Sequence, residues 1–234
     1  MSWSHFVVLL GISDNKARRF YEKQAIIENW SKRELERQID ASLFERLALS
    51  RDKKGVLQLS KKGHITKHAT EVIKDPYVLD FLKISQSLRI TEKQLEQKII
   101  DNLQLFLLEL GKGFAFIGRQ YKISFRNKHF YIDLVFYHRI LKCFVLIDLK
   151  TKAVKHTDIG QMNLYLNYFK TEESVEEDNE PIGIILSADK DEVLIEYATG
   201  GISNKIFVSQ YKLYLPDKKQ LEKQVKSILD KDQV

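Results

Sequence analysis

Two apolar segments, 130–137 and 143–149, constrain the fold most, because they read as neighbouring β-strands joined by a short turn. Both segments are apolar enough to be buried, yet each carries charge. Asp133 lies inside the first segment, and Asp148 lies at the end of the second, two residues before Lys150. A chain that buries such strands must find partners for these charges.

The register of this hairpin places the two carboxylates together. If the hairpin is symmetric about Ile140 and Leu141, Asp133 lies directly opposite Asp148, with Cβ atoms about 5 Å apart. Like charges in that position are destabilising, and burial costs each ion several kcal/mol more. A hard cation such as Mg²⁺ offsets this, since it takes carboxylate oxygens and keeps several waters. We therefore predict a metal site at Asp133 and Asp148, with Lys150 on the same strand face. Charges of an edge strand facing water remain the alternative.

The rest of the C-terminal part reads as an α/β domain. The capping box TEKQ at 91–94 starts a helix that runs to Gly111 and Gly113. Strands are expected near 114–125, 130–137, 143–149, 182–188 and 205–209, and helices near 158–170, near 190–198 and from 218. The expected core is therefore α-β-β-β-α-β around a mixed central sheet.

The N-terminal part is expected to be all-helical. The SKRE stretch at 31–34 is a capping box followed by apolar residues at helical spacing. The basic segment 51–68 breaks this pattern and is interpreted as a cationic loop or short hairpin, and Pro76 is expected to open a short helix. We place the domain boundary between a helical region, 1–88, and an α/β domain, 89–234.

Four further side chains are assigned from their positions in the expected elements. Glu109 lies in the last turn of the helix from Thr91, where the helix dipole disfavours an anion unless a metal is near; a solvated surface carboxylate is the alternative. Gln161 and Tyr165 are four residues apart on the next helix, so both can reach one spot over the sheet. His138, in the hairpin turn, is expected at the surface.

Composition adds three limits. The formal net charge of +6 mildly favours an anionic partner. The one cysteine, Cys143, excludes an intrachain disulfide and suits a reducing compartment. No apolar run reaches the length of about 18 residues that a membrane-spanning helix needs. We expect a cytoplasmic protein without a membrane segment.

The order of these residues resembles the PD-(D/E)XK nuclease superfamily. An acid on the first helix, Asp in a strand, D-x-K in the next strand and Gln-x-x-x-Tyr on the following helix match its pattern, although Ile132 stands where the motif's name has Pro. The stretch FYIDLVFYHRILKCFVLIDLKTKAVKHTDIGQMNLYLNYF is similar to the YhcG-like branch. In that branch a restriction-endonuclease-like domain follows a helical, winged-helix-like DNA-binding region, which is expected to be truncated here.

The resemblance implies a role for each matching position. Asp133 and Asp148 correspond to the metal-binding acids, with Glu109 as the helix acid that assists them. Lys150 corresponds to the lysine that orients or activates the attacking water. Gln161 and Tyr165 correspond to the accessory pair beside the site.

The implied function is a Mg²⁺-dependent deoxyribonuclease, with Mn²⁺ as a substitute metal, DNA as partner and no organic cofactor. Cutting both strands of a duplex commonly uses two sites, which favours a homodimer. The expected DNA-binding residues are Arg119, Lys122, Arg126 and Lys128. Two alternatives stay open: a catalytically silent nucleic-acid-binding or assembly module that retains the fold, and a metal enzyme for small phosphates. The absence of a Gly-rich phosphate loop counts against the latter.

Overall fold

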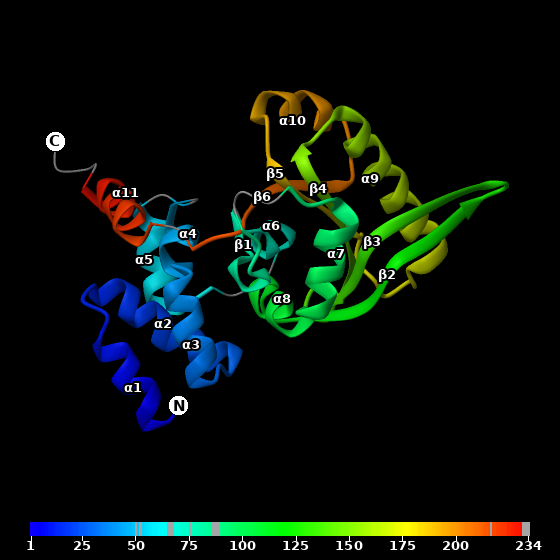
Figure 1. The fold of residues 1–234 in the computed structure, drawn as a ribbon. Helices are drawn as coiled ribbons and strands as arrows, with labels where there is room; N and C mark the ends of the chain where they lie inside the picture. Colours follow the sequence, from blue (N-terminus) through cyan, green and yellow to red (C-terminus); the bar gives the residue numbers. More distant parts are fainter. Residues whose placement is uncertain are drawn as a thin grey trace. The chain divides into compact units, whose positions relative to one another are not determined.

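The structure, a computed structural model, describes residues 1–49, 51, 53–64, 68–74, 76–85, 89–215 and 217–230 (Figure 1). It divides into two compact units. Unit 1 contains Met1–Ile65 together with Tyr214–Val234, and unit 2 contains Thr66–Leu213. This division differs from the expected boundary after residue 88. The segment before that boundary contributes a strand to the sheet of unit 2, and the C-terminal segment returns to unit 1.

Unit 1 is helical, as expected. Its helices are α1 (Trp3–Leu10), α2 (Asn15–Glu28), α3 (Lys32–Asp40), α4 (Leu43–Leu49), α5 (Lys53–Lys62) and α11 (Lys218–Asp230). The predicted capping box at the start of α3 is present: Ser31 N–H donates to Glu34 Oε2 at 2.6 Å, and Glu34 N–H donates to Ser31 Oγ at 3.3 Å. A buried aromatic group forms the core, in which the Phe20 ring contacts the rings of Tyr21 and Phe44.

Two local predictions in this region are wrong. The described part of 51–68 contains helix α5 rather than a loop or hairpin, because Val56 and Leu59 are spaced for one helix face and are buried. Residues 52 and 65–67 of that segment lie outside the described residues. The helix expected after Pro76 is instead a short strand, β1 (Tyr77–Val78), followed by a 3₁₀ turn, η1 (Asp80–Leu82). A further short helix, α6 (Ala69–Val72), precedes β1.

Unit 2 contains a six-stranded mixed sheet in the order β1-β6-β5-β4-β3-β2, as the α/β prediction required. The long strands are β2 (Phe114–Phe125), β3 (Lys128–His138), β4 (Cys143–Ala153), β5 (Ile182–Asp189) and β6 (Lys205–Lys212). β2, β3 and β4 are antiparallel neighbours, whereas β4, β5, β6 and β1 pair in parallel. Strand β1 pairs Tyr77 with Tyr211 at the end of β6, which joins the 66–88 segment to the sheet.

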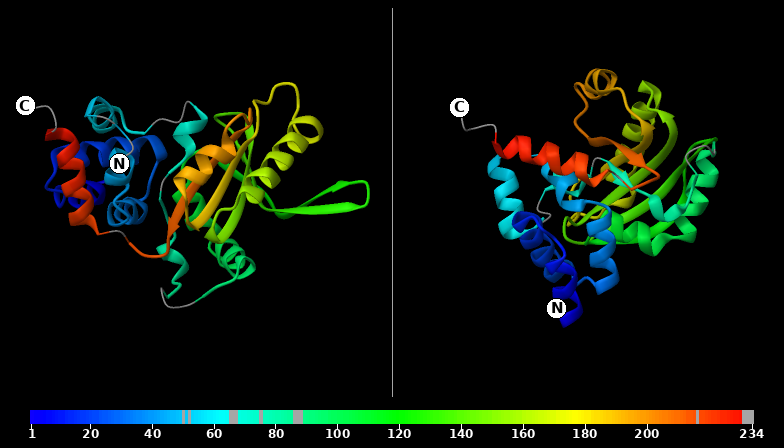
Figure 2. Two further views of the ribbon diagram at one scale, coloured as in Figure 1. Left: turned by 90° about the horizontal axis from the view of Figure 1, so that it is seen from above. Right: turned by 60° about the vertical axis from the view of Figure 1, so that its left-hand side comes forward.

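The helices of unit 2 cover both faces of the sheet (Figures 1 and 2). They are α7 (Glu92–Asp101), α8 (Leu103–Leu110), α9 (His156–Tyr168), a π-helical turn η2 (Phe169–Glu173) and α10 (Glu192–Thr199). Along β4, the side chains of Val145, Ile147 and Leu149 pack with α7 and α8, whereas Leu146 packs with α9. This alternation confirms the strand prediction. The single helix expected up to Gly111 is broken at Asn102 into α7 and α8.

Within the described residues, every helix is too short or too polar to cross a membrane.

Candidate active site

The hairpin of β3 and β4 has the predicted register. The paired residues run from His138 with Cys143 to Leu134 with Ile147, so the next step along both strands reaches Asp133 and Asp148. Regular pairing ends there. Asp133 Oδ2 instead accepts a hydrogen bond of 2.8 Å from the backbone N–H of Leu149. A side-chain carboxylate thus takes the place of a backbone acceptor at the point where the two strands part.

Asp148 is deeply buried and is paired with Lys150. Lys150 Nζ lies 2.6 Å from Asp148 Oδ2 and 3.9 Å from Asp158 Oδ1, at the start of α9. Burial raises the pKa of Asp148 to about 7; the Lys150 ammonium opposes this shift and the Asp133 carboxylate adds to it. For Lys150, burial lowers the pKa, but Asp148 and further acids outweigh it and the net shift is upward. An ionised Asp148 is therefore costly here, and a bound cation would offset that cost.

Asp133 occupies a similar environment. Burial raises its pKa, while hydrogen bonds from Leu149 N–H and Gln120 and the charge of Lys150 lower it. Each of the two carboxylates is thus partly desolvated, and both are close enough to Lys150 to interact with it electrostatically. The structure therefore brings Asp133, Asp148 and Lys150 close together.

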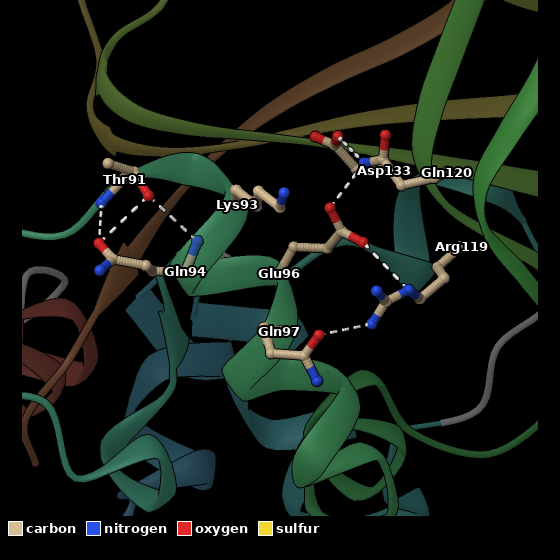
Figure 3. Close-up of a pocket in the computed structure, with 8 residues that line it drawn as sticks. All are labelled: Thr91, Lys93, Gln94, Glu96, Gln97, Arg119, Gln120 and Asp133. Atoms are coloured by element: carbon tan, nitrogen blue, oxygen red, sulfur yellow. Dashed lines mark hydrogen bonds and ion pairs between the residues drawn. The ribbon is translucent and has the colours of Figure 1, made fainter.

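Glu96, on α7, is a site residue that the sequence reasoning missed. Its side chain is buried, and Gln120 Nε2 donates to Glu96 Oε2 at 2.6 Å and to Asp133 Oδ1 at 3.0 Å, so one amide bridges the two carboxylates (Figure 3). Burial raises the pKa of Glu96, and the charge of Asp133 adds to the shift. In the sequence, the feature that could have indicated Glu96 is its position next to Leu95, on the buried face of the helix.

The backbone of β2 explains how Gln120 reaches this position. The β2–β3 ladder shifts register between Phe116 and Gly118, and Gln120 itself has a φ of 46°, in the left-handed region. Such bulges re-aim side chains, and here the amide points between Glu96 and Asp133 (Figure 3).

Glu109 does not join this group. Its carboxylate is fully buried in α8, where Oε1 accepts a hydrogen bond of 2.9 Å from Val78 N–H of β1. Its backbone carbonyl accepts from the Lys74 ammonium. The break at Asn102 separates α8 from α7, so the acid beside Asp133 comes from α7, and the expected position of Glu109 at the metal site is wrong.

Gln161 and Tyr165 are adjacent to each other, as the spacing predicted. The Gln161 amide donates to the Tyr165 hydroxyl, which in turn donates to the Tyr131 carbonyl at 3.3 Å. Burial raises the pKa of Tyr165, and the charges of Asp148 and Asp133 raise it further. The pair therefore lies within electrostatic reach of both carboxylates.

The four predicted basic residues are not equivalent. Arg119 is held against α7, with Nε 3.6 Å from Glu96 Oε1 and Nη1 donating to Gln97 Oε1 at 2.8 Å. Lys122, Arg126 and Lys128 are exposed along the β2–β3 hairpin. A pocket of about 780 Å³ opens beside Asp133 and is lined by Arg119, Gln120, Glu96 and the first turns of α7.

The donor set suits a hard divalent cation, but it is not a closed cage. Among the described residues, no group of three His, Cys, Asp or Glu side chains is arranged to hold a metal ion. Asp133 and Asp148 supply carboxylate oxygens, and Glu96 lies across the Gln120 amide from Asp133. Mg²⁺ commonly uses one or two carboxylates and retains waters, so these residues fit it.

Comparison with known proteins identifies the family of the chain. The family described as "YhcG PDDEXK nuclease domain" matches residues 70–226, and the family described as "DUF1016 N-terminal domain" matches residues 1–46. The Escherichia coli (strain K12) protein named "Putative nuclease YhcG" is 40% identical over 218 residues. That match covers 93% of this chain and 58% of the relative, so the chain spans little more than half of the relative's length.

Two solved structures show weaker likeness. A repair endonuclease from Pyrococcus abyssi gives a TM-score of 0.35 at 17% identity, covering 56% of this chain and 50% of its own. The apo form of EndoMS gives 0.34 at 13% identity, covering 56% and 49%.

The fold and the site thus define an α/β protein with a nuclease domain of the PDDEXK type. The chain belongs to the YhcG family.

Proposed function

We propose that this protein is a metal-dependent nuclease that hydrolyses phosphodiester bonds in DNA. The observation that carries the proposal is the adjacency of Asp133, Asp148 and Lys150 at the parting of β3 and β4. The family membership supports the same reaction class. A silent binding module has no need for two partly desolvated carboxylates and an ammonium in one place, since their desolvation is costly.

Each residue has a chemical task in this proposal. Asp133 and Asp148 would hold Mg²⁺ or Mn²⁺, and Glu96 would complete the set when the Gln120 amide moves aside. The metal would supply Lewis acidity toward the scissile phosphate. The Lys150 ammonium, held by Asp148 at 2.6 Å, is placed to orient the attacking water and to stabilise negative charge as it develops. Gln161 and Tyr165 would position the substrate or a water through the hydroxyl of Tyr165.

DNA approach would use the exposed basic side chains of the β2–β3 hairpin, together with Arg119 at the rim of the pocket. A homodimer and a cytoplasmic location both stay predictions, and so does a DNA-binding role for the helical region.

The test is cleavage of linear, circular and branched DNA, and of RNA with the same sequence, with Mg²⁺, Mn²⁺ or EDTA. Asp133→Asn, Asp148→Asn and Lys150→Ala should each lower the cutting rate by at least about a hundredfold. Lys152→Ala is the matched control, because Lys152 is an exposed lysine two residues further along β4. Cutting that survives in EDTA, or equal activity in Lys150→Ala and Lys152→Ala, would contradict the proposal. Cutting of RNA alone would correct the substrate.

A further inference from the structure

The outer part of the β2–β3 hairpin is a two-stranded ribbon with two different faces. Among the described residues, β4 pairs with β3 only as far as Leu134, and beyond that residue β2 and β3 pair only with each other. One face carries aromatic and aliphatic side chains. Tyr121 packs on Phe169 and Phe130 on Tyr165, with ring centroids 5.4 and 6.4 Å apart. This face is covered by α9 and η2.

The other face carries two exposed cross-strand pairs, Lys122 with Tyr131 and Ser124 with His129. We call these four residues the open face. Ser124 Oγ lies 2.8 Å from His129 Nδ1, so one of the two pairs is joined by a hydrogen bond. Phe130 and Ile132 pack with α9, so the intervening Tyr131 points to the other side of β3, where Gln120 joins Asp133 to Glu96 of α7. The open face is therefore continuous with the carboxylate of the proposed metal site.

Tyr131 is the distinctive member of the open face. Its side chain is 49% exposed, which is high for a large aromatic residue near a partly buried carboxylate. Its backbone is nevertheless fixed, since its carbonyl accepts the hydrogen bond from Tyr165 Oη of α9. The ring is thus an exposed aromatic surface on a backbone held in place by a hydrogen bond, roughly 7 Å along the strand from Asp133.

Charge on the ribbon favours an anionic occupant. Residues 114–132 contain no Asp or Glu, and the open face carries the Lys122 ammonium directly across from Tyr131. An aromatic ring next to a cation is the combination that binds single-stranded nucleic acid, through base stacking and a phosphate contact.

We propose that the open face is the track for an unpaired strand of nucleic acid that leads to the active site. One base stacks on Tyr131, and Lys122 contacts a phosphate. The proposal rests on the proposed function and deepens it, because it specifies an unpaired end or flap as the preferred substrate. A free two-stranded ribbon can enter a duplex major groove, but here one face is already covered by α9, and a paired base cannot offer its face to Tyr131.

The basic residues of the ribbon, which the sequence did not distinguish, differ in their position relative to the open face. Lys122 lies on the open face. Lys128 is the cross-strand partner of Phe125, on the face that α9 covers. Arg126 lies in the turn between the strands, with a φ of 53°. Lys122 should therefore contribute more to binding than Lys128.

Binding is measured first, in EDTA so that no cutting occurs. The probes are fluorescein-labelled DNAs of one sequence: a single strand, a blunt duplex, and a duplex with a single-stranded flap. Fluorescence anisotropy is recorded for the full chain over a range of salt concentrations. Tyr131→Ala should weaken single-strand and flap binding about tenfold or more, while Tyr131→Phe, which keeps a ring that can stack, should stay within about twofold. Blunt-duplex binding should be weak and unaffected by either change.

Lys122→Gln should weaken single-strand binding. It should also reduce the steepness of the dependence of log K on log salt concentration by about 0.7, the value for one phosphate contact on a single strand. Lys128→Gln should weaken binding less than Lys122→Gln, and Lys142→Gln is the control, an exposed lysine in the turn between β3 and β4. Circular dichroism checks that each variant is folded.

Three results would overturn the track: no nucleic-acid binding by the wild-type chain, wild-type flap binding by Tyr131→Ala, or equal losses in Lys122→Gln and Lys128→Gln. If Tyr131→Ala weakened binding to the blunt duplex as much as binding to the flap, the preference for an unpaired strand would be wrong. Failure of the proposed function would look different. In that case the protein would bind flap DNA through Tyr131 but would cut no substrate with Mg²⁺ or Mn²⁺.

Discussion

Glu96 and Asp133 come from different elements, yet a single amide joins them: Gln120 Nε2 lies 2.6 Å from the first carboxylate and 3.0 Å from the second. The donor offsets the repulsion between two partly desolvated acids, and it occupies the space between them (Figure 3). Removal of the amide should lower the stability of the protein, whereas its displacement by a bound metal should raise it. The metal-free and metal-bound states can therefore be tested separately.

Gln120→Ala should destabilise the metal-free protein. Two carboxylates would lose a shared hydrogen-bond donor, so we expect the free energy of unfolding in EDTA to fall by about 1 kcal/mol. Urea denaturation measures this change, and Gln104→Ala, an exposed glutamine of α8, is the control. Saturating Mn²⁺ should bring Gln120→Ala closer to wild type, since the cation replaces the lost donor. Equal stability of the two variants in EDTA would refute the role of the amide.

Divalent metal should stabilise the wild-type protein. At a metal concentration of roughly one hundred times Kd, binding to the folded state alone adds about 2.7 kcal/mol, which raises the Tm by several degrees. Asp133→Asn and Asp148→Asn should each remove that shift. In EDTA, Asp148→Asn should lower the stability, because it leaves the partly buried Lys150 ammonium without the charge of its 2.6 Å partner. The measurement is thermal unfolding with Mg²⁺, Mn²⁺ or EDTA, and a normal metal shift in both variants would place the metal elsewhere.

Glu96 and Glu109 should respond to substitution in different ways. Glu96→Gln should reduce cutting by at least about tenfold while the free energy of unfolding changes little, since the side chain keeps its place beside Gln120. Glu109→Ala removes the acceptor of Val78 N–H and should lower the free energy of unfolding by roughly 1–3 kcal/mol, with cutting retained below the melting range. The cutting rate and the urea denaturation curve of each variant are measured in parallel to distinguish these two roles. A loss of activity confined to Glu109→Ala would reverse the assignment.

The stability of the protein should fall in mild acid because of His138. This side chain is buried rather than exposed as the turn position suggested, and its Nδ1 accepts a hydrogen bond of 3.1 Å from Leu141 N–H. Burial lowers the pKa of His138 below 6.5, so the unfolded chain takes up the proton first as the pH falls. Its contribution to stability is therefore complete above about pH 7 and is lost as the pH falls through 6.5 toward the lower pKa of the folded state.

His138→Asn tests this assignment, because an Asn oxygen can accept from Leu141 N–H but does not titrate. The drop in urea midpoint between pH 7.5 and 5.5 should be smaller in this variant than in wild type. His156→Asn, at an exposed position at the start of α9, should leave the drop unchanged. An identical pH profile in wild type and His138→Asn would rule out His138 as the source.

Much of the site could be predicted because it depends on local rules. The apolar runs, their alternation and a short turn define the β3–β4 register, and the register alone brings Asp133 level with Asp148. Gln161 and Tyr165 follow from helical spacing in the same way.

Other predictions failed where distant contacts decide local structure. Tyr77 and Val78 form a strand only because the end of β6 lies beside them, and no pattern of two residues can announce that. Helix α5 forms despite Gly55 inside it, since Val56 and Leu59 are buried within unit 1. Intrinsic propensity is a weak prior that such tertiary contacts override.

By itself, the sequence determined the paired acids, the lysine beside them and the α/β order that holds them, because periodicity and spacing are properties of adjacent residues. Only the tertiary structure decided which helix acid lies beside Asp133. Glu96 and Glu109 are both acids on the predicted first helix, and the break at Asn102 sends one to Asp133 and the other to β1. A bulge in β2 then places Gln120 between the two carboxylates, which is a consequence of strand pairing that sequence spacing does not encode.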